Sequence, residues 1–122
     1  ANNMSKLIAK VIGIRPTTSK DGNLFWNVGF RLEEPVSVAT GVGADGKPIL
    51  ESSDTFSMAT DHEFPEETLG KWYEIEGLAL RVAVDEDGSV VRHAGVGQPC
   101  LNADKGRLVK FTKLEEQGIV FA

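Results

Sequence analysis

A run of apolar residues at every second position between residues 24 and 32 constrains the fold of this chain more than any other feature. Successive side chains of a β-strand point to opposite faces, so such a run predicts a strand with one buried face. The residues expected in a core are Leu24, Trp26, Val28, Phe30 and Leu32. The residues expected to face outward are Phe25, Asn27 and Arg31.

Other extended segments lie on both sides of this strand. Residues 6–14 are rich in β-branched side chains, and the turn-forming residues 19–23 predict a hairpin between this segment and residues 24–32. A second hairpin is expected between residues 36–42 and 49–58. A long strand is expected over residues 71–84, with Trp72 facing inward and Gly77 placed where the strand would bend.

The rest of the chain adds further short strands and little helix. Residues 85–88 predict a turn with a returning strand over 89–94, and a last strand is expected over 107–114. Residues 61–70 have room for one or two helical turns at most. This pattern predicts an all-β fold, a small antiparallel Greek-key barrel like the OB-fold, with a β-sandwich as the open alternative.

The length of 122 residues favours one domain, expected over residues 4–122. Ala1 to Asn3 precede Met4 and are expected to be a remnant of expression cloning. No apolar run approaches the roughly 20 residues that a membrane span needs, and no secretion signal is evident. We therefore expect a cytoplasmic protein that makes no contact with membranes, in the host cytoplasm if it is viral.

Catalytic and metal-binding motifs are absent from the sequence. A single cysteine and two histidines do not make a conventional zinc site, and neither a phosphate-binding loop nor a nucleophile elbow is present. The sequence therefore predicts a protein that is not an enzyme, with no catalytic residue, no metal and no cofactor.

Charge is divided unevenly along the chain. Residues 1–32 carry five basic side chains against one acidic, residues 33–87 carry three against fourteen, and residues 88–122 carry five against three. If the two basic ends meet in the fold, they form a positive surface on an acidic body, which would suit a polyanion. An ordinary mixed surface is the alternative.

The outward face of residues 24–32 is the first candidate binding surface. Proteins hold single-stranded nucleic acids by stacking bases on aromatic rings while basic side chains contact phosphates. Phe25 is the candidate ring, and Asn27 and Arg31 share its face. Arg15 and Lys20 lie in the same hairpin and are candidate phosphate contacts. In the structural alternative, Phe25 covers a loop or the short helix and Arg31 is ordinary surface charge.

Two further groups of candidates lie later in the chain. Tyr73 is expected on the face opposite Trp72 and is a second candidate for stacking. The densest basic stretch contains Lys105, Arg107 and Lys110, which are candidate phosphate contacts. An edge strand that its lysines protect from aggregation would have the same composition.

These features resemble the small single-stranded DNA-binding proteins of filamentous and related phages, and OB-fold single-strand binders more widely. The residues that carry the resemblance are 10–15, 18–25 and 69–75, the last of which lead into the Asp87-Gly88 turn. The resemblance implies a homodimer that coats single-stranded DNA cooperatively during replication, with little sequence preference and no metal or nucleotide. It also implies that the hairpin with Lys20 and Phe25 is the DNA-binding wing. The acidic middle of the chain and the long stretch 33–58 depart from the family pattern.

A second function remains open on the sequence alone. The acidic total and the apolar end, residues 118–122, favour a protein-interaction domain or a virion-type structural β-domain. We expect this end to pack on its own barrel or across a dimer interface, and docking on a protein partner is the alternative. DNA and RNA are not distinguished by the sequence.

Overall fold

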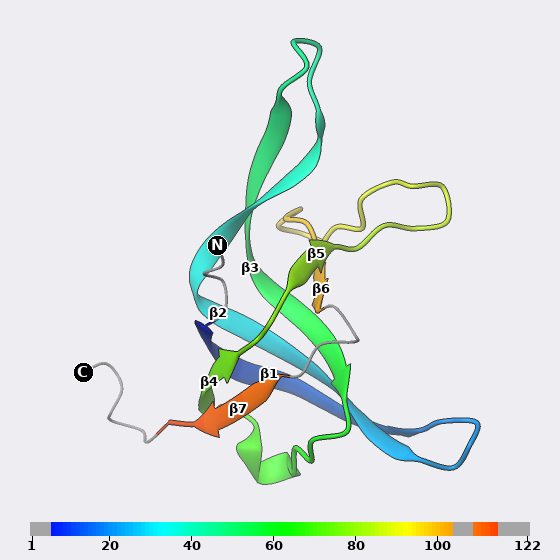
Figure 1. Ribbon diagram of the computed structural model, residues 1–122, viewed down its shortest axis with the longest axis vertical. Coiled ribbons are helices and arrows are strands. Elements are labelled where there is room, and N and C mark those ends of the chain that lie inside the picture. Colours follow the sequence, from blue (N-terminus) through cyan, green and yellow to red (C-terminus); the bar gives the residue numbers. More distant parts are fainter. Residues whose placement is uncertain (1–5, 104–108, 115–122) are drawn as a thin grey trace.

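The computed structural model describes residues 6–103 and 109–114, and these residues are nearly all in strands and turns (Figure 1). The strands are β1 (Lys6–Thr18), β2 (Leu24–Val42), β3 (Pro48–Thr60), β4 (Trp72–Glu76), β5 (Leu80–Val82), β6 (Leu101–Ala103) and β7 (Lys110–Lys113). The described helical structure is one 3-10 turn, η2 (Glu66–Thr68), so the expectation of at most one short helix is confirmed.

All seven described strands belong to one sheet, in the order β5-β6-β3-β2-β1-β4-β7. The pairs are antiparallel except β3 with β6, which run parallel. β4 and β5 are consecutive in the chain, yet they lie near opposite ends of this order. One bent stretch of chain therefore joins the two ends of the sheet, which curls on itself (Figure 1). The fold is a small OB-fold-like barrel rather than two packed sheets.

The bend between β4 and β5 changes which residues face the core. Gly77 has a φ of 83°, a left-handed conformation that glycine adopts without steric cost. Before the bend the buried residues are Tyr73 and Ile75, whereas after it Leu78 is buried. The sequence-based expectation of one continuous strand with Trp72 inward is therefore wrong: β4 presents its odd-numbered residues to the core.

The predicted alternation of β2 is confirmed over its central part. Val28, Phe30 and Leu32 are buried, and the Phe30 ring stacks on Phe56 with 5.0 Å between ring centroids. Trp26 is half-buried and packs against the same core. Leu24 is 52% exposed, which contradicts its expected burial, because this end of the β1–β2 hairpin projects beyond the barrel (Figure 1).

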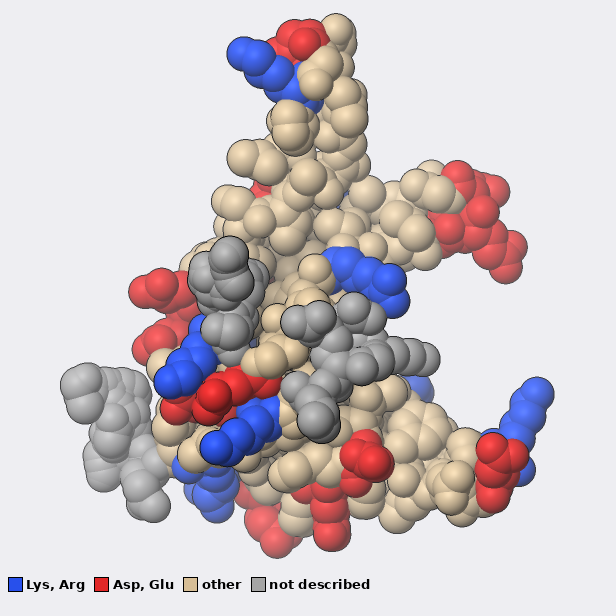
Figure 2. All heavy atoms as spheres, in the orientation of Figure 1, with Lys and Arg blue, Asp and Glu red and all other residues tan. Residues whose placement is uncertain are grey.

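β2 continues further than the sequence predicted. The two expected segments, 24–32 and 36–42, form one strand. A register shift between Arg31 and Val36 accommodates the stretch around Pro35, and a second shift follows Ala39. The outer part of β2 pairs with β3 to form an arm, residues 39–50, which projects from the barrel (Figure 1). Figure 2 shows few charged side chains along this arm except near its tip. No helix among the described residues is long and apolar enough to span a membrane.

Candidate nucleic-acid interface

The outer face of the barrel carries two rows of residues that cross several strands. Directly paired residues of adjacent strands point to the same side of a sheet, so the register identifies each row. The first row contains Gly13, Gly29, Ser57, Asn102 and Arg81, from β1, β2, β3, β6 and β5 in that order. The second contains Arg15, Asn27 and Ala59. Neighbouring positions on the other face include buried Val28 and Phe30, so the two rows face away from the core.

A groove of about 560 Å³ follows these rows, and all eight of their residues line it. Its volume lies in the range of roughly 300–1,000 Å³ that is typical of ligand sites. Arg15 and Arg81 come from strands on opposite sides of β2 and β3, and both are exposed. The predicted residues Arg15 and Asn27 are therefore brought together here, while Arg81 and Asn102 are additions that the structure supplies.

Two more basic residues lie beside the groove on the same face. Arg31 pairs with Lys10 of β1 on one side and with Thr55 of β3 on the other. The Lys10 ammonium lies 5.7 Å from the centre of the Trp72 ring, a cation–π distance. The ion pairs formed among residues 6–103 and 109–114 are Lys6 with Glu74 and Arg92 with Glu51. Within the described chain, Lys10, Arg15, Arg31 and Arg81 therefore form no ion pair with an acidic side chain.

The β1–β2 hairpin extends the outer face past the groove. Phe25 pairs with Thr17 and is half-buried, and the Asn27 Nδ2 donates a hydrogen bond of 3.1 Å to the Thr17 hydroxyl. Phe25 lies one strand position from Trp26 and therefore on the face away from the core, as the sequence predicted. Lys20 is exposed in the turn that connects the two strands, and this turn projects from the barrel (Figure 1).

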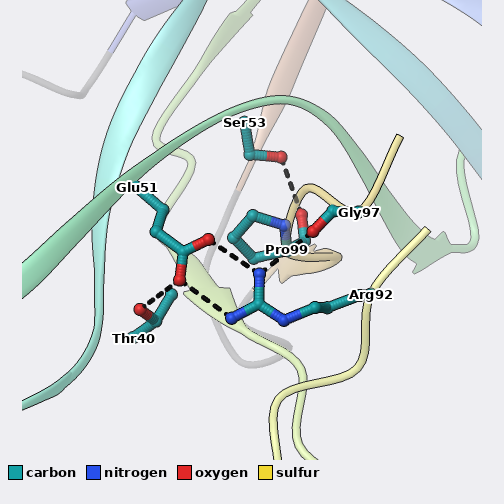
Figure 3. Close-up of polar contacts among 6 residues, drawn as sticks. All are labelled: Thr40, Glu51, Ser53, Arg92, Gly97 and Pro99. Carbon is teal, nitrogen blue, oxygen red and sulfur yellow. Dashed lines mark hydrogen bonds and ion pairs between the residues drawn. The ribbon is translucent and has the colours of Figure 1, made fainter. Parts of the chain in front are cut away.

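A long loop, residues 83–100, is fixed to β3 next to the groove. The Arg92 guanidinium donates two hydrogen bonds to the Glu51 carboxylate, at 2.7 and 2.8 Å, and a third to the Gly97 carbonyl oxygen at 3.0 Å (Figure 3). The Thr40 hydroxyl donates to the same carboxylate at 2.6 Å. These hydrogen bonds, with the charge of Arg92, lower the pKa of Glu51 from 4.5 to about 2. The loop is therefore held by a charge-assisted contact.

Other hydrogen bonds attach the same loop to the middle of β3, at residues 53–55. The Ser53 hydroxyl donates to the Pro99 carbonyl oxygen at 2.8 Å (Figure 3), and the Thr55 hydroxyl lies 2.6 Å from His93 Nε2. The Gln98 Nε2 donates to the Asp54 carboxylate at 3.0 Å. Acidic side chains gather at the far end of this loop, residues 85–87 (Figure 2). The loop is thus anchored at its base and carries its negative charge at its tip.

The structure does not bring every predicted residue to this surface. Tyr73 is 5% exposed and packs edge-on against Phe64, with 5.3 Å between ring centroids, and burial raises the pKa of its hydroxyl. Its proposed stacking role is wrong, because Tyr73 belongs to the core. Lys110 is exposed but lies on β7, at the opposite end of the sheet from β5. Lys105, Arg107 and the apolar end 118–122 lie outside the described residues.

Arg81 and Asn102, the two groove residues that the sequence analysis missed, differ in whether the sequence contains a signal for them. Arg81 lies between Leu80 and Val82, so alternation already placed it outside the core. Asn102 gave no signal, because a three-residue strand such as β6 is too short to show a period. Among the described residues, no three side chains of histidine, cysteine, aspartate or glutamate are grouped to hold a metal ion. The sequence matches no protein-family model and no curated protein.

Proposed function

We propose that this protein binds single-stranded DNA along the outer face of its barrel, with little sequence preference. The observation that supports this most directly is the set of basic residues on that face, from three strands, with no acidic partner in the described chain: Lys10, Arg15, Arg31 and Arg81. Basic side chains gathered around a groove attract a polyanion even when the whole molecule carries a formal net charge of −5.

Each part of the surface has a distinct task in this proposal. The arginines contact phosphates, since a guanidinium donates paired hydrogen bonds to phosphate oxygens. Phe25 stacks on a base where the strand leaves the groove toward the hairpin, and Lys20 contacts a phosphate near the turn. The loop 83–100 is fixed on β3 by the contact between Glu51 and Arg92, so it needs no ordering when a strand binds in the neighbouring groove.

The biological setting belongs to the same proposal. The resemblance to the phage proteins supports a role in phage DNA replication as a cooperative homodimer in the host cytoplasm, without enzymatic activity or a cofactor. The apolar end, residues 118–122, supports the dimer because a short apolar segment gains about 25 cal/mol for each Å² that it buries.

A protein-interaction function is the second candidate, and the arm favours it. Val42 is 70% exposed and Leu50 is 64% exposed, and Ile49 lies beside them. Exposed apolar side chains of this kind often mark a contact with another protein. Such a contact would use the arm rather than the groove, and it would depend weakly on salt.

One titration separates these two functions. The fluorescence of Trp26 and Trp72 is followed while oligothymidine, and separately oligouridine, is added at several salt concentrations. We expect saturable binding of oligothymidine that weakens steeply as salt rises. The titration with oligouridine decides between DNA and RNA. Absence of binding to both oligomers at low salt would refute the proposed function and favour the protein-interaction function.

A further inference from the structure

Two glycines face each other at the centre of the groove. Gly13 of β1 pairs directly with Gly29 of β2, and both line the groove. Glycine inside a strand destabilises a protein relative to alanine, because it loses more backbone freedom on folding and packs no side chain. Two such residues at one point of the outer face therefore require a physical reason.

Backbone conformation does not supply that reason. The glycines with a positive φ are all at other positions, so Gly13 and Gly29 have backbone angles that other residues adopt. The register shift between Val11 and Gly13 does not change this, since the bulge type that needs glycine needs it in the left-handed region.

Packing does not supply the reason either. A Cβ atom built on Gly13 meets nothing within 4 Å. A Cβ built on Gly29 comes closest to Cγ1 of Ile12, at 3.7 Å, which is an ordinary van der Waals contact. The described fold therefore has room for alanine at both positions. A remaining reason for glycine in a strand is the close approach of a ligand to the backbone.

The surroundings of the glycine pair indicate what kind of ligand approaches. The row continues with the small Ser57, so the floor of the groove stays low beyond the two strands. The Asn27 Nδ2 donates to Thr17, which leaves its carbonyl oxygen to accept. Asn102 accepts from the Ser57 hydroxyl at 3.3 Å, which leaves its amide nitrogen to donate. A flat floor between an amide acceptor and an amide donor suits a planar ring with polar edges.

We propose that Gly13 and Gly29 form a subsite on which one nucleobase of the bound strand lies flat against the exposed peptide groups. Asn27 and Asn102 hydrogen-bond the edges of that base, while Arg15 and Arg81 contact the phosphates on either side. A methyl group on either glycine lifts the base off the peptide plane. This inference rests on the proposed function and adds to it a contact that Phe25 does not make.

The test substitutes each glycine by alanine and uses a matched control. Gly41→Ala is the control, because Gly41 also lies in β2 with an ordinary φ and lies on the arm, away from the groove. Its Cβ would meet Ile49 Cδ1 at 3.8 Å, again an ordinary contact. Thermal unfolding establishes that the variants fold, and we expect each melting temperature to stay equal to the wild-type value or to rise.

Binding is then measured with two oligomers of equal length, oligothymidine and an abasic oligomer with the same phosphates. We expect Gly13→Ala and Gly29→Ala to weaken oligothymidine binding on the order of tenfold, the scale of one lost stacking contact. Gly41→Ala should bind as the wild type does. On the abasic oligomer, wild type and all three variants should bind equally, because no base is present to be displaced.

The possible contrary results are distinct. If the wild type binds oligothymidine and the groove variants bind equally well, the base subsite is refuted and the proposed function stands. If the variants lose affinity for both oligomers alike, the glycines admit the phosphate backbone instead, and the subsite is again refuted. If the wild type binds neither oligomer, the proposed function itself fails.

Discussion

Removing the two arginines that line the groove should reduce the salt dependence of DNA binding by a predictable amount. For single strands, the logarithm of the binding constant falls with the logarithm of the salt concentration with a slope of about −0.7 per phosphate neutralised. If Lys10, Arg15, Lys20, Arg31 and Arg81 each neutralise one phosphate, the expected slope is about −3.5. The double variant Arg15→Gln/Arg81→Gln should then show a slope of about −2.1.

These slopes translate into affinities that an ordinary titration resolves. Between about 50 and 200 mM salt, wild-type affinity for oligothymidine should fall roughly 130-fold and that of the double variant roughly 18-fold. Fluorescence titrations at four salt concentrations measure both slopes. Lys47→Gln is the control, because Lys47 is exposed in the turn between β2 and β3 at the tip of the arm, and its removal also lowers the net charge by one. It should leave the slope at the wild-type value.

Two results would refute this reasoning. A wild-type slope near zero would show that phosphates are not neutralised, and the groove would lose its assigned role. If Lys47→Gln reduced the slope as much per charge as the arginine substitutions do, the effect would come from net charge and not from the position of the arginines.

Four further predictions concern single features. Phe25→Ala should weaken oligothymidine binding by about 1–3 kcal/mol through lost stacking and leave thermal unfolding unchanged; equal binding would exclude the stacking role. Trp26→Ala should lower the free energy of unfolding, measured in urea, but by less than the ~3–5 kcal/mol typical of a fully buried tryptophan, since Trp26 is half-buried; no loss would place its ring outside the core. The pKa of Glu51 is lowered from 4.5 to about 2, so its ion pair with Arg92 stabilises the fold above pH 4.5 and is lost as the pH falls toward 2. Arg92→Ala should therefore reduce the fall in melting temperature over that pH interval, and an unchanged profile would contradict the assignment. Deleting residues 118–122 should lower the melting temperature or convert dimer to monomer, by thermal unfolding and light scattering; no change in either would favour a tail that docks on another protein.

Local patterns in the sequence predicted most of the fold. The period of two in residues 24–32 identified the core face of β2, and the turn residues placed both long hairpins. Two features escaped this reasoning for physical reasons. The change of facing residues at Gly77 depends on a bend that periodicity does not record, and it moved Tyr73 into the core. The parallel pairing of β6 with β3 joins segments that are more than forty residues apart in the chain.

The candidate site was predictable only where it lies on long strands. Asn27 and Arg31 face outward as alternation predicted, because β2 is long enough to show a period, and Arg15 of the neighbouring β1 pairs directly with Asn27. Arg81 and Asn102 lie on strands of three residues, and only the closure of the sheet brings them next to Ser57. A site assembled from five strands therefore depends on topology, which no single segment of sequence contains.

The loop 83–100 and the groove share strand β3, so the contacts that fix the loop also hold part of the proposed site. Its anchors reach β3 at Glu51, Ser53 and Thr55, and β3 supplies Ser57 and Ala59 to the groove floor. Lys10, Arg31 and Thr55 are paired across β1, β2 and β3 and form a third row on the outer face. The contact of His93 with the Thr55 hydroxyl connects the loop to the end of this row. A change in the loop thus reaches the basic face through one strand. Because that strand is hydrogen-bonded on both sides, the groove has its shape without a ligand, and under the proposed function this lowers the cost of binding a flexible single strand.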